Sequence, residues 1–291
     1  MKLVRELNVE YQLSLKESLV FQGDASQILI KLPENFFRCV VTSPPYWGLR
    51  DYGIEGQIGA EDDPDKYIDR LVLIFNQVKR VLKNDGTLWL NIGDSYTSGN
   101  RSYRAPDKKN PIRAMSYRAK TPQGLKPKDL VGIPWRLAFA LQQAGWYLRS
   151  DIIWDKPNCM PESVKDRPTR SHEYIFLLTK NLRYYYSSMS VSEKNGSNRR
   201  SVWSIPTEAF SGAHFATFPP ALIEPCILAG ANQNDWVLDP FFGSGTVGAV
   251  CERLNRKYVG IELNPRYVKI AINRIKNTER PLFPIIKGHI K

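Results

Sequence analysis

Apolar residues along the chain fall into short continuous runs and into longer stretches with helical spacing. The short runs predict seven strands, at Leu19–Gln22, Cys39–Thr42, Thr87–Ile92, Tyr147–Trp154, Glu173–Leu178, Trp236–Asp239 and Tyr258–Glu262. The longer stretches predict five helices, at Tyr67–Leu82, Leu130–Ala144, Leu222–Ala229, Val247–Leu254 and Pro265–Ile275. Strands that alternate with helices are typical of an α/β fold with a largely parallel sheet. No helical pattern separates Tyr147–Trp154 from Glu173–Leu178, so these two strands should form an antiparallel pair.

Turn residues set the expected ends of two helices. Asn84-Asp85-Gly86 should stop the helix over Tyr67–Leu82 and turn the chain into the next strand. Gly145 should close the helix over Leu130–Ala144. The sequence contains no internal repeat, and we expect residues 1–291 to form a single domain.

The composition fits a folded protein of the reducing interior of a cell. Of the 291 residues, 42% are hydrophobic and 11% aromatic, which is enough for a sizeable core and excludes intrinsic disorder as the main state. No apolar run approaches the roughly 18 residues that span a bilayer, and the first residues do not resemble a secretory signal. The four cysteines are scattered, without the Cys-x-x-Cys spacing of zinc or redox sites. We therefore expect a cytoplasmic protein without a metal.

The positive charge of the chain is concentrated in one segment. The formal net charge is +12, and residues 100–128 hold nine Lys or Arg residues against Asp107 alone. That segment has four prolines and little apolar periodicity, so it predicts a long mobile loop. Lys and Arg interleaved with Tyr are side chains that grip phosphates and stack on bases. The candidate nucleic-acid contacts in this basic loop are Arg101, Arg104, Lys108, Lys109, Arg113 and Arg118.

A second polar segment, residues 181–212, is rich in Ser, Asn and Arg. It predicts a small insertion that recognises the target, with Arg199 and Arg200 as candidate contacts. The basic stretch after Arg266 is interpreted instead as a solvated helix face.

The strand over Trp236–Asp239 runs into a glycine-rich sequence. Gly243-x-Gly245-x-x-Gly248 matches the dinucleotide fingerprint, and Glu262 ends the next strand 19 residues after Gly243. Such glycines let the backbone approach a ligand, and an acidic residue at the next strand end accepts hydrogen bonds from ribose hydroxyls. The pattern favours a nucleoside-containing ligand over a tight turn alone, but it does not separate NAD from another adenosine cofactor.

The strand over Cys39–Thr42 ends in Ser43-Pro44-Pro45-Tyr46. Two prolines fix the backbone and remove two N–H donors, which leaves a hydroxyl and bare carbonyl oxygens to accept hydrogen bonds. The Tyr46 ring beside them offers a stacking surface. This set suits an amino group on a flat ring, although Pro-Pro after a strand is also found as a stiff turn. In an open α/β sheet this motif and the glycine motif would face one crevice.

Together the two motifs resemble those of the amino-methylating DNA methyltransferases, which move a methyl group from S-adenosylmethionine to an exocyclic base nitrogen. Ser43–Tyr46 is similar to the catalytic signature of that family, and Asp239–Thr246 is similar to its cofactor signature. The catalytic motif comes first, as in the circularly permuted beta subgroup. The resemblance implies a Rossmann-like class I methyltransferase fold with a seven-stranded, mostly parallel sheet that has one antiparallel strand. It extends through further segments of the chain: Leu88–Asp94, Trp154-x-Lys156 and His172-Glu173.

The resemblance also implies a role for each candidate site residue. The catalytic residues would be Ser43, Pro44, Pro45 and Tyr46. The S-adenosylmethionine site would be formed by Asp24, Thr217, Phe218, Asp239, Phe241, Gly243, Gly245, Thr246 and Glu262. Glu262 would hold the ribose and Asp24 the adenine amino group. The partner would be double-stranded DNA in a prokaryotic cytoplasm, bound by a monomer or a homodimer, with a cognate restriction endonuclease as the second expected partner.

The target base would leave the duplex, stack on Tyr46 and offer its amino group to Ser43 Oγ and the Pro44 carbonyl. Catalysis would then consist of positioning, without a covalent enzyme intermediate. In the family, Ser at position 43 is commoner among cytosine-N4 enzymes, so we expect N4-methylcytosine as the product, with N6-methyladenine as the alternative. Pro225-Cys226 matches the nucleophile dipeptide of cytosine-C5 enzymes, but on this apolar helix face the cysteine should belong to the core.

Three other function classes stay open. A non-catalytic DNA-binding module would use the basic loop but would leave both strand-end motifs unexplained. An NAD-dependent oxidoreductase would need a hydride-transfer site for which the sequence offers no plausible residues. A protein or RNA methyltransferase fits Pro-Pro-Tyr as well, and the charge of the basic loop favours a nucleic acid over a protein.

Overall fold

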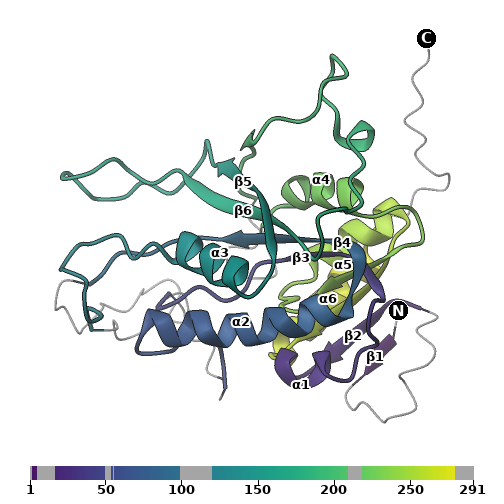
Figure 1. The fold of residues 1–291 in the computed structure, drawn as a ribbon, viewed down its shortest axis with the longest axis horizontal. Helices are drawn as coiled ribbons and strands as arrows, with labels where there is room; N and C mark the ends of the chain where they lie inside the picture. Colours follow the sequence, from purple (N-terminus) through teal and green to yellow (C-terminus); the bar gives the residue numbers. More distant parts are fainter. Residues whose placement is uncertain are drawn as a thin grey trace.

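The computed structural model describes residues 2–4, 17–49, 54, 56–98, 120–208 and 218–278, which form one sheet with helices on both faces (Figure 1). The strands are β1 (Lys2–Val4), β2 (Leu19–Gln22), β3 (Phe37–Thr42), β4 (Leu82–Ile92), β5 (Tyr147–Asp155), β6 (His172–Thr179), β7 (Val202–Ser204), β8 (Trp236–Asp239) and β9 (Lys257–Glu262). The helices are α1 (Ala25–Leu29), α2 (Pro64–Val81), α3 (Ile133–Gln143), α4 (Pro220–Gly230), α5 (Thr246–Leu254) and α6 (Pro265–Lys276), with a 3-10 turn η2 (Met189–Val191). Every predicted strand and helix is present, with shifts at the ends.

The strands lie in the order β1-β2-β9-β8-β3-β4-β6-β5-β7. β6 runs antiparallel to both of its neighbours, and the other pairs are parallel. The prediction of one antiparallel strand is therefore confirmed. The predicted number of seven strands is wrong, because β1 and β7 each add three residues at an edge of the sheet. Strands of that length are too short to show a clear pattern in the sequence.

In the described part of the chain, three helices cover each face of the sheet. α1, α2 and α3 pack side by side on one face, over a core that includes Phe75 and Leu137. α4, α5 and α6 cover the other face, where Ile227 and Val250 are fully buried. Because both faces are buried, the inner strands are continuous apolar runs rather than alternating ones.

The sequence of α2 shows why this helix begins and ends where it does. The Asp63 side chain caps the helix by accepting a hydrogen bond from the Asp65 N–H at 2.7 Å, and Pro64 occupies the first turn. Lys79 and Arg80 lie in the last turn, where cations interact favourably with the helix dipole.

The predicted turn at residues 84–86 is a bulge in β4 instead. β4 already pairs with β3 at Leu82, and the next pair is at Thr87. The residues between them bulge out, and Asp85 in the bulge forms an ion pair with Arg38 of β3. The prediction was wrong because the turn-forming residues Asn, Asp and Gly also suit the irregular backbone of a bulge.

β3 and β8 lie side by side, and the chain leaves them in opposite directions. From β3 it passes through α2 to β4, and from β8 it passes through α5 to β9. Diverging connections of this kind leave a crevice outside the carboxyl ends of the strands, where α/β proteins bind ligands. β2 pairs with β9, so the beginning and the end of the sequence build the same half of the sheet.

The two polar segments differ in how much of them the structure describes. Of the predicted insertion at residues 181–212, the described part extends the sheet through β7, and Trp203 packs into the core beneath α4, α5 and α6. Most of the basic loop, residues 99–119, lies outside the described residues. Near its end, Lys128 forms an ion pair with Asp166 at 2.7 Å.

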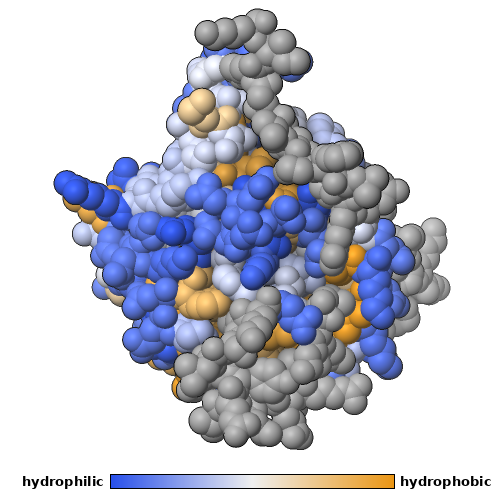
Figure 2. All heavy atoms as spheres, turned by 90° about the vertical axis from the view of Figure 1, so that its right-hand side faces the viewer, coloured by the Kyte–Doolittle hydropathy of each residue, from blue (hydrophilic) through white to orange (hydrophobic). Residues whose placement is uncertain are grey.

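Figure 2 shows the face that lies at the right-hand side of Figure 1. Hydrophilic side chains cover most of its coloured surface, and the apolar patches between them are small. In the described part of the chain, no helix combines the length and the apolar character needed to cross a membrane. The same residues contain no group of three or more His, Cys, Asp or Glu side chains placed to hold a metal ion.

Candidate active site

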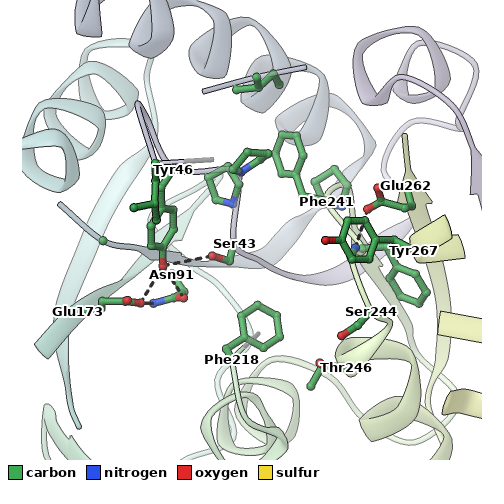
Figure 3. A pocket seen from close by; sticks show the side chains of 18 of the residues that line it. Ser43, Tyr46, Asn91, Glu173, Phe218, Phe241, Ser244, Thr246, Glu262 and Tyr267 are labelled. Atoms are coloured by element: carbon green, nitrogen blue, oxygen red, sulfur yellow. Dashed lines mark hydrogen bonds between the residues drawn. The ribbon is translucent and has the colours of Figure 1, made fainter. Parts of the chain in front are cut away.

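A cleft of about 850 Å³ opens at the carboxyl ends of β3 and β8. One group of lining side chains follows β3 and another follows β8, and the Phe218 ring lies between them (Figure 3). The two strand ends are tied together by the Thr42 hydroxyl, which donates to Asp239 at 2.6 Å. The two motifs therefore face one cavity, as the sequence predicts.

The segment after β3 lines the first half of the cleft with Ser43, Pro44, Pro45 and Tyr46. The Tyr67 hydroxyl of α2 donates to the Pro45 carbonyl at 2.8 Å, which fastens the segment to the helix layer. Within the described residues, no hydrogen bond engages the Pro44 carbonyl oxygen. That oxygen is therefore available as an acceptor.

Tyr46 is fixed at both its ring and its hydroxyl. The ring packs on Gly93, where an added Cβ would lie 2.7 Å from a ring carbon, so the close approach requires glycine. The hydroxyl donates to Glu173 Oε2 at 2.7 Å and lies 3.2 Å from Asn91 Oδ1 and 3.5 Å from Ser43 Oγ. Burial, followed by the Glu173 carboxylate, raises the pKa of Tyr46 well above its usual value. The phenol therefore stays protonated and remains a donor.

Glu173 of β6 receives partners from two further strands. Asn91 Nδ2 of β4 donates to the same Oε2 at 3.3 Å, and Lys156, just after β5, forms an ion pair with the other oxygen. Both side chains of that ion pair are only 16% exposed. Lys156 also lies 4.1 Å from the centroid of the Trp154 ring, in a cation–π contact. The carboxylate that holds Tyr46 is thus neutralised by a nearly buried cation.

No role was predicted for Asn91, Lys156 or Glu173, although the family resemblance runs through all three segments. A signal was present, because each is a polar residue within or directly after a predicted apolar strand. The pairing of Trp154 with Glu173 across β5 and β6 then places Lys156 beside the carboxylate. These residues could not be grouped from the sequence, because it does not give the register in which the strands pair.

Glu262, the last residue of β9, lies in the second half of the cleft. Its carboxylate accepts hydrogen bonds from the backbone N–H groups of Gly243 and Asn264, both at 2.7 Å. Burial raises the pKa of Glu262 to about 7. Each carboxylate oxygen has a second lone pair, and the residue lines the cleft, so it can also accept from ligand hydroxyls.

Two of the predicted cofactor residues lie behind the cleft wall rather than on it. Asp239 is buried, accepts from the Phe241 N–H at 3.0 Å, and has its pKa raised by burial to about 7. Gly245 begins α5 with φ 78°, and an added Cβ would lie 2.8 Å from Ala271 Cβ of α6. Asp239 therefore fixes the turn after β8, and Gly245 lets α5 pack closely on α6.

Two hydroxyl groups line the cleft beside Gly243. Ser244 Oγ and Thr246 Oγ1 accept hydrogen bonds from Arg274 Nη1 of α6, at 3.0 and 2.6 Å. The guanidinium occupies one acceptor position of each hydroxyl, so the hydroxyl hydrogens are free to point into the cleft. This corner can donate to an anionic ligand group such as a carboxylate.

Asp24 and Phe218 line the cleft as well. Asp24 caps α1, with its side chain accepting from the Ser26 N–H at 2.7 Å. Phe218 precedes α4, and its ring enters the space between the two halves (Figure 3). The remaining predicted cofactor residue, Thr217, lies outside the described residues.

Most of the predicted catalytic and cofactor residues thus meet in one place. Those that line the cleft are Asp24, Ser43, Pro44, Pro45, Tyr46, Phe218, Phe241, Gly243, Thr246 and Glu262.

Two of the predicted DNA contacts, Arg199 and Arg200, lie within the described residues. The Arg199 guanidinium stacks over Trp203 at 4.6 Å, Arg200 is exposed, and neither lines the cleft. The other candidates lie outside the described residues: Arg101, Arg104, Lys108, Lys109, Arg113 and Arg118.

Cys226 behaves as the sequence predicts. It is 1% exposed inside α4, and its thiol lies 3.6 Å from the Leu222 carbonyl oxygen. Burial raises the pKa of the Cys226 thiol well above its usual value, which disfavours the thiolate. The assignment of Cys226 to the core is confirmed, and it is not placed to act as a nucleophile in the cleft.

Comparison with known proteins identifies relatives that are DNA methyltransferases. The family N6_N4_Mtase, described as DNA methylase, matches residues 37–273. The Type II methyltransferase M.Cfr9I of Citrobacter freundii is 63% identical over 280 residues, which cover 95% of this chain and 93% of that protein. The Type II methyltransferase M.SmaI of Serratia marcescens is 60% identical over 268 residues, covering 90% and 92%.

Solved structures share the fold. The PvuII DNA methyltransferase (cytosine-N4-specific) superimposes with a TM-score of 0.69 at 22% identity, covering 89% of this chain and 86% of that one. A DNA modification methylase of Thermus thermophilus, TTHA0409, complexed with S-adenosyl-L-methionine, gives a TM-score of 0.64 at 25% identity, covering 91% and 95%. The predicted Rossmann-like methyltransferase fold is confirmed.

The groups that line the second half of the cleft fit S-adenosylmethionine, the methyl donor of this family. Asp24 and Glu262 supply acceptors for amino and hydroxyl groups, and Ser244 and Thr246 supply donors for a carboxylate. An oxidoreductase is excluded by the family match. The chain belongs to the N6/N4 DNA methylase family and is a DNA methyltransferase that acts on a base amino group.

Proposed function

We propose that this protein moves the methyl group of S-adenosylmethionine to the exocyclic N4 of a cytosine turned out of duplex DNA. The observation that carries the proposal is the single cleft that joins Ser43–Tyr46 to the corner around Glu262. A base held in the first half would present its amino group to a methyl donor held in the second. Enzymes that modify a base in this way must take it out of the stack.

Each residue of the catalytic half binds or orients the base. Tyr46, locked by Gly93 and Glu173, stacks on the extruded ring. Ser43 Oγ and the Pro44 carbonyl oxygen accept hydrogen bonds from the amino group, which directs the nitrogen lone pair toward the cofactor half. When bound, the cofactor supplies an electrophilic methyl group on a sulfonium. The protein therefore contributes positioning and needs no nucleophile of its own.

Ser43 supports cytosine over adenine. In this family serine at the first position of the motif is commoner among cytosine-N4 enzymes.

Mass spectrometry of the nucleosides from duplex DNA treated with the protein and S-adenosylmethionine tests the base. N4-methylcytosine is the expected product, and N6-methyladenine without it would refute the cytosine assignment. The Ser43→Ala variant should bind the cofactor normally and yield about a hundredfold less product, because a hydrogen bond that matters in the transition state is lost.

We also propose that the protein serves a restriction–modification system, in which a cognate endonuclease cuts the unmethylated site. The support is that both bacterial relatives are named Type II methyltransferases. DNA from cells that express the protein, read by single-molecule sequencing, should carry the modification at one short sequence. Modification scattered over unrelated sequences would contradict this role.

Two further features belong to the same proposal. A circular permutation is supported by the motif order, with Ser43–Tyr46 before Asp239–Thr246, and by the pairing of β2 with β9. Arg199, Arg200 and the basic loop are the proposed DNA contacts, with residues 181–212 as the target-recognition region.

A further inference from the structure

The connection between β5 and β6, residues 156–171, projects beyond the sheet (Figure 1). β5 runs in the same direction as β4 and β3, so this hairpin loop begins at the edge of the sheet where Ser43–Tyr46 lies. Cys159, Met160 and Glu162 of the hairpin loop line the cleft. The loop therefore forms part of the mouth through which a base enters the catalytic half.

The hairpin loop is held on both sides of position 160. On one side Asn158 Nδ2 donates to the Thr207 carbonyl at 2.9 Å, and the Thr207 N–H donates back to Asn158 Oδ1 at 2.7 Å. On the other side Glu162 accepts a hydrogen bond from Arg167 at 2.6 Å, and the Arg167 guanidinium stacks on Tyr96 at 3.9 Å. These contacts hold the backbone between Asn158 and Glu162 in position.

Met160 stands between the anchors with 69% of its surface exposed, although it lines the cleft. Pro157 and Pro161 restrict the backbone around it. Arg170 at the same cleft wall is paired with Asp94 at 3.7 Å, so the positive charge that suits a phosphate backbone comes from the exposed Lys165. An apolar side chain on a firm support beside a base pocket has the form of the wedges that proteins insert between base steps.

We propose that Met160 is such a wedge, and that it enters the duplex where the target base leaves and fills the gap in the stack. The proposal rests on the proposed function only in that a base leaves a duplex, and it applies to cytosine and adenine alike. The thioether suits this place because it is flexible and makes favourable contacts with aromatic rings. Its burial between the neighbouring bases would offset part of the cost of unstacking.

The test compares two variants, Met160→Ala and Leu73→Ala, on duplexes that carry the methylation site of the protein. Leu73 is the matched control, because this apolar side chain is 68% exposed on α2 and does not line the cleft. One duplex is fully paired, and the other has a mismatch at the target base, which lowers the cost of extrusion. Met160→Ala should lower kcat/KM on the paired duplex by about tenfold. On the mismatched duplex it should come within about twofold of the wild type.

Rescue by the mismatch is the result that a merely structural role would not give. Equal losses on both duplexes, or no loss on either, would overturn the proposal, as would a Leu73→Ala variant with the same defect. Met160→Leu should keep the wild-type rate, and the Kd for S-adenosylmethionine should be the same in every variant. If the product is N6-methyladenine, the cytosine assignment fails while this test proceeds unchanged on the adenine site.

Discussion

The two halves of the cleft are built in different ways. In the cofactor half, one carboxylate accepts hydrogen bonds from the backbone: Glu262 binds the N–H groups of Gly243 and Asn264. In the catalytic half, side chains bind side chains: the Tyr46 hydroxyl meets Glu173, which in turn holds Lys156. The cofactor half is therefore complete once β8 and β9 pair. The catalytic half also requires β4, β5 and β6 to pair in the correct register.

Because the two halves are built differently, substitutions in them should have different effects. Loss of Glu262 removes an anchor for a ligand and leaves two backbone donors without it, so it should appear as lost cofactor affinity. Loss of one member of the Tyr46 network should appear as lost rate, or as lost stability where the partner left behind is a buried charge. Substitutions in each half, and one outside both, separate these outcomes.

The largest effect is expected outside both halves, in DNA binding. Replacement of the basic-loop residues Lys108, Lys109, Arg113 and Arg118 by Gln should weaken DNA binding by about two to three orders of magnitude at physiological salt. The slope of log K against log salt concentration should fall by up to about 3.6, since each lost phosphate contact contributes about 0.9. Cofactor binding, measured by calorimetry, should not change. An unaltered salt slope would contradict the assignment of the loop.

In the cofactor half, Glu262→Ala should raise the Kd for S-adenosylmethionine by about a hundredfold, because about 3 kcal/mol of charged hydrogen bonding is lost. Isothermal titration measures this directly. Glu193→Ala changes an exposed carboxylate far along the chain and serves as the control. A Glu262→Ala protein that binds the cofactor normally would remove Glu262 from the site.

In the catalytic half, Tyr46→Ala should lower kcat by about tenfold to a hundredfold through the lost stacking surface. Tyr46→Phe keeps the ring and loses the hydroxyl, with its bond to Glu173 and its longer contacts with Asn91 and Ser43, so it should cost about fivefold. Single-turnover methylation rates would distinguish the two. Neither variant should change the Kd for the cofactor, and a large change would show that the halves are not separate.

The ion pair should matter for stability. Glu173→Gln leaves Lys156 nearly buried without its carboxylate, and should lower the free energy of unfolding by about 1–3 kcal/mol in urea titrations. Glu162→Gln breaks the more exposed pair with Arg167 and should cost less than about 1 kcal/mol. Equal losses of unfolding free energy for the two variants would contradict a larger stabilising role of the Glu173–Lys156 pair.

The cofactor half should also respond to pH. With its pKa raised to about 7, the Glu262 carboxyl is mostly protonated below that pH, whereas ligand hydroxyls donate best to the ionised form. Cofactor affinity should therefore rise by about tenfold between pH 6 and pH 8, and Glu262→Gln should flatten this rise. The raised pKa also means that the stability contributed by this group is present below its ordinary pKa and is lost as the pH rises through 7.

Much of the fold could be predicted because its signals are local. Each inner strand is an apolar run, and the motifs at Ser43 and Gly243 directly follow two of these runs. Parallel strands place such ends on one edge of the sheet, so the meeting of the two motifs follows from topology alone.

What could not be predicted depends on contacts between distant segments. Tyr46 and Glu173 are 127 residues apart, and only the pairing of β4, β5 and β6 brings them together. Asp239 and Gly245 belong to the cofactor motif, but their contacts with Phe241 and Ala271 place them behind the cleft wall. A motif marks where a site lies without separating the residues that touch the ligand from those that shape the turn.

The pairing of β2 with β9 has a consequence for how the protein folds during its synthesis. Among the described strands β9 is the last to be synthesised, yet it lies between β2 and β8, and the Tyr258 N–H donates to Ser18 Oγ across 240 residues. A nascent chain that lacks β9 exposes the unpaired edges of β2 and β8. Such edges form hydrogen bonds with strands of other chains and so promote aggregation. The cofactor half should therefore form only after β9 has been synthesised, and premature termination near Lys257 should yield aggregation-prone fragments rather than a partly active enzyme.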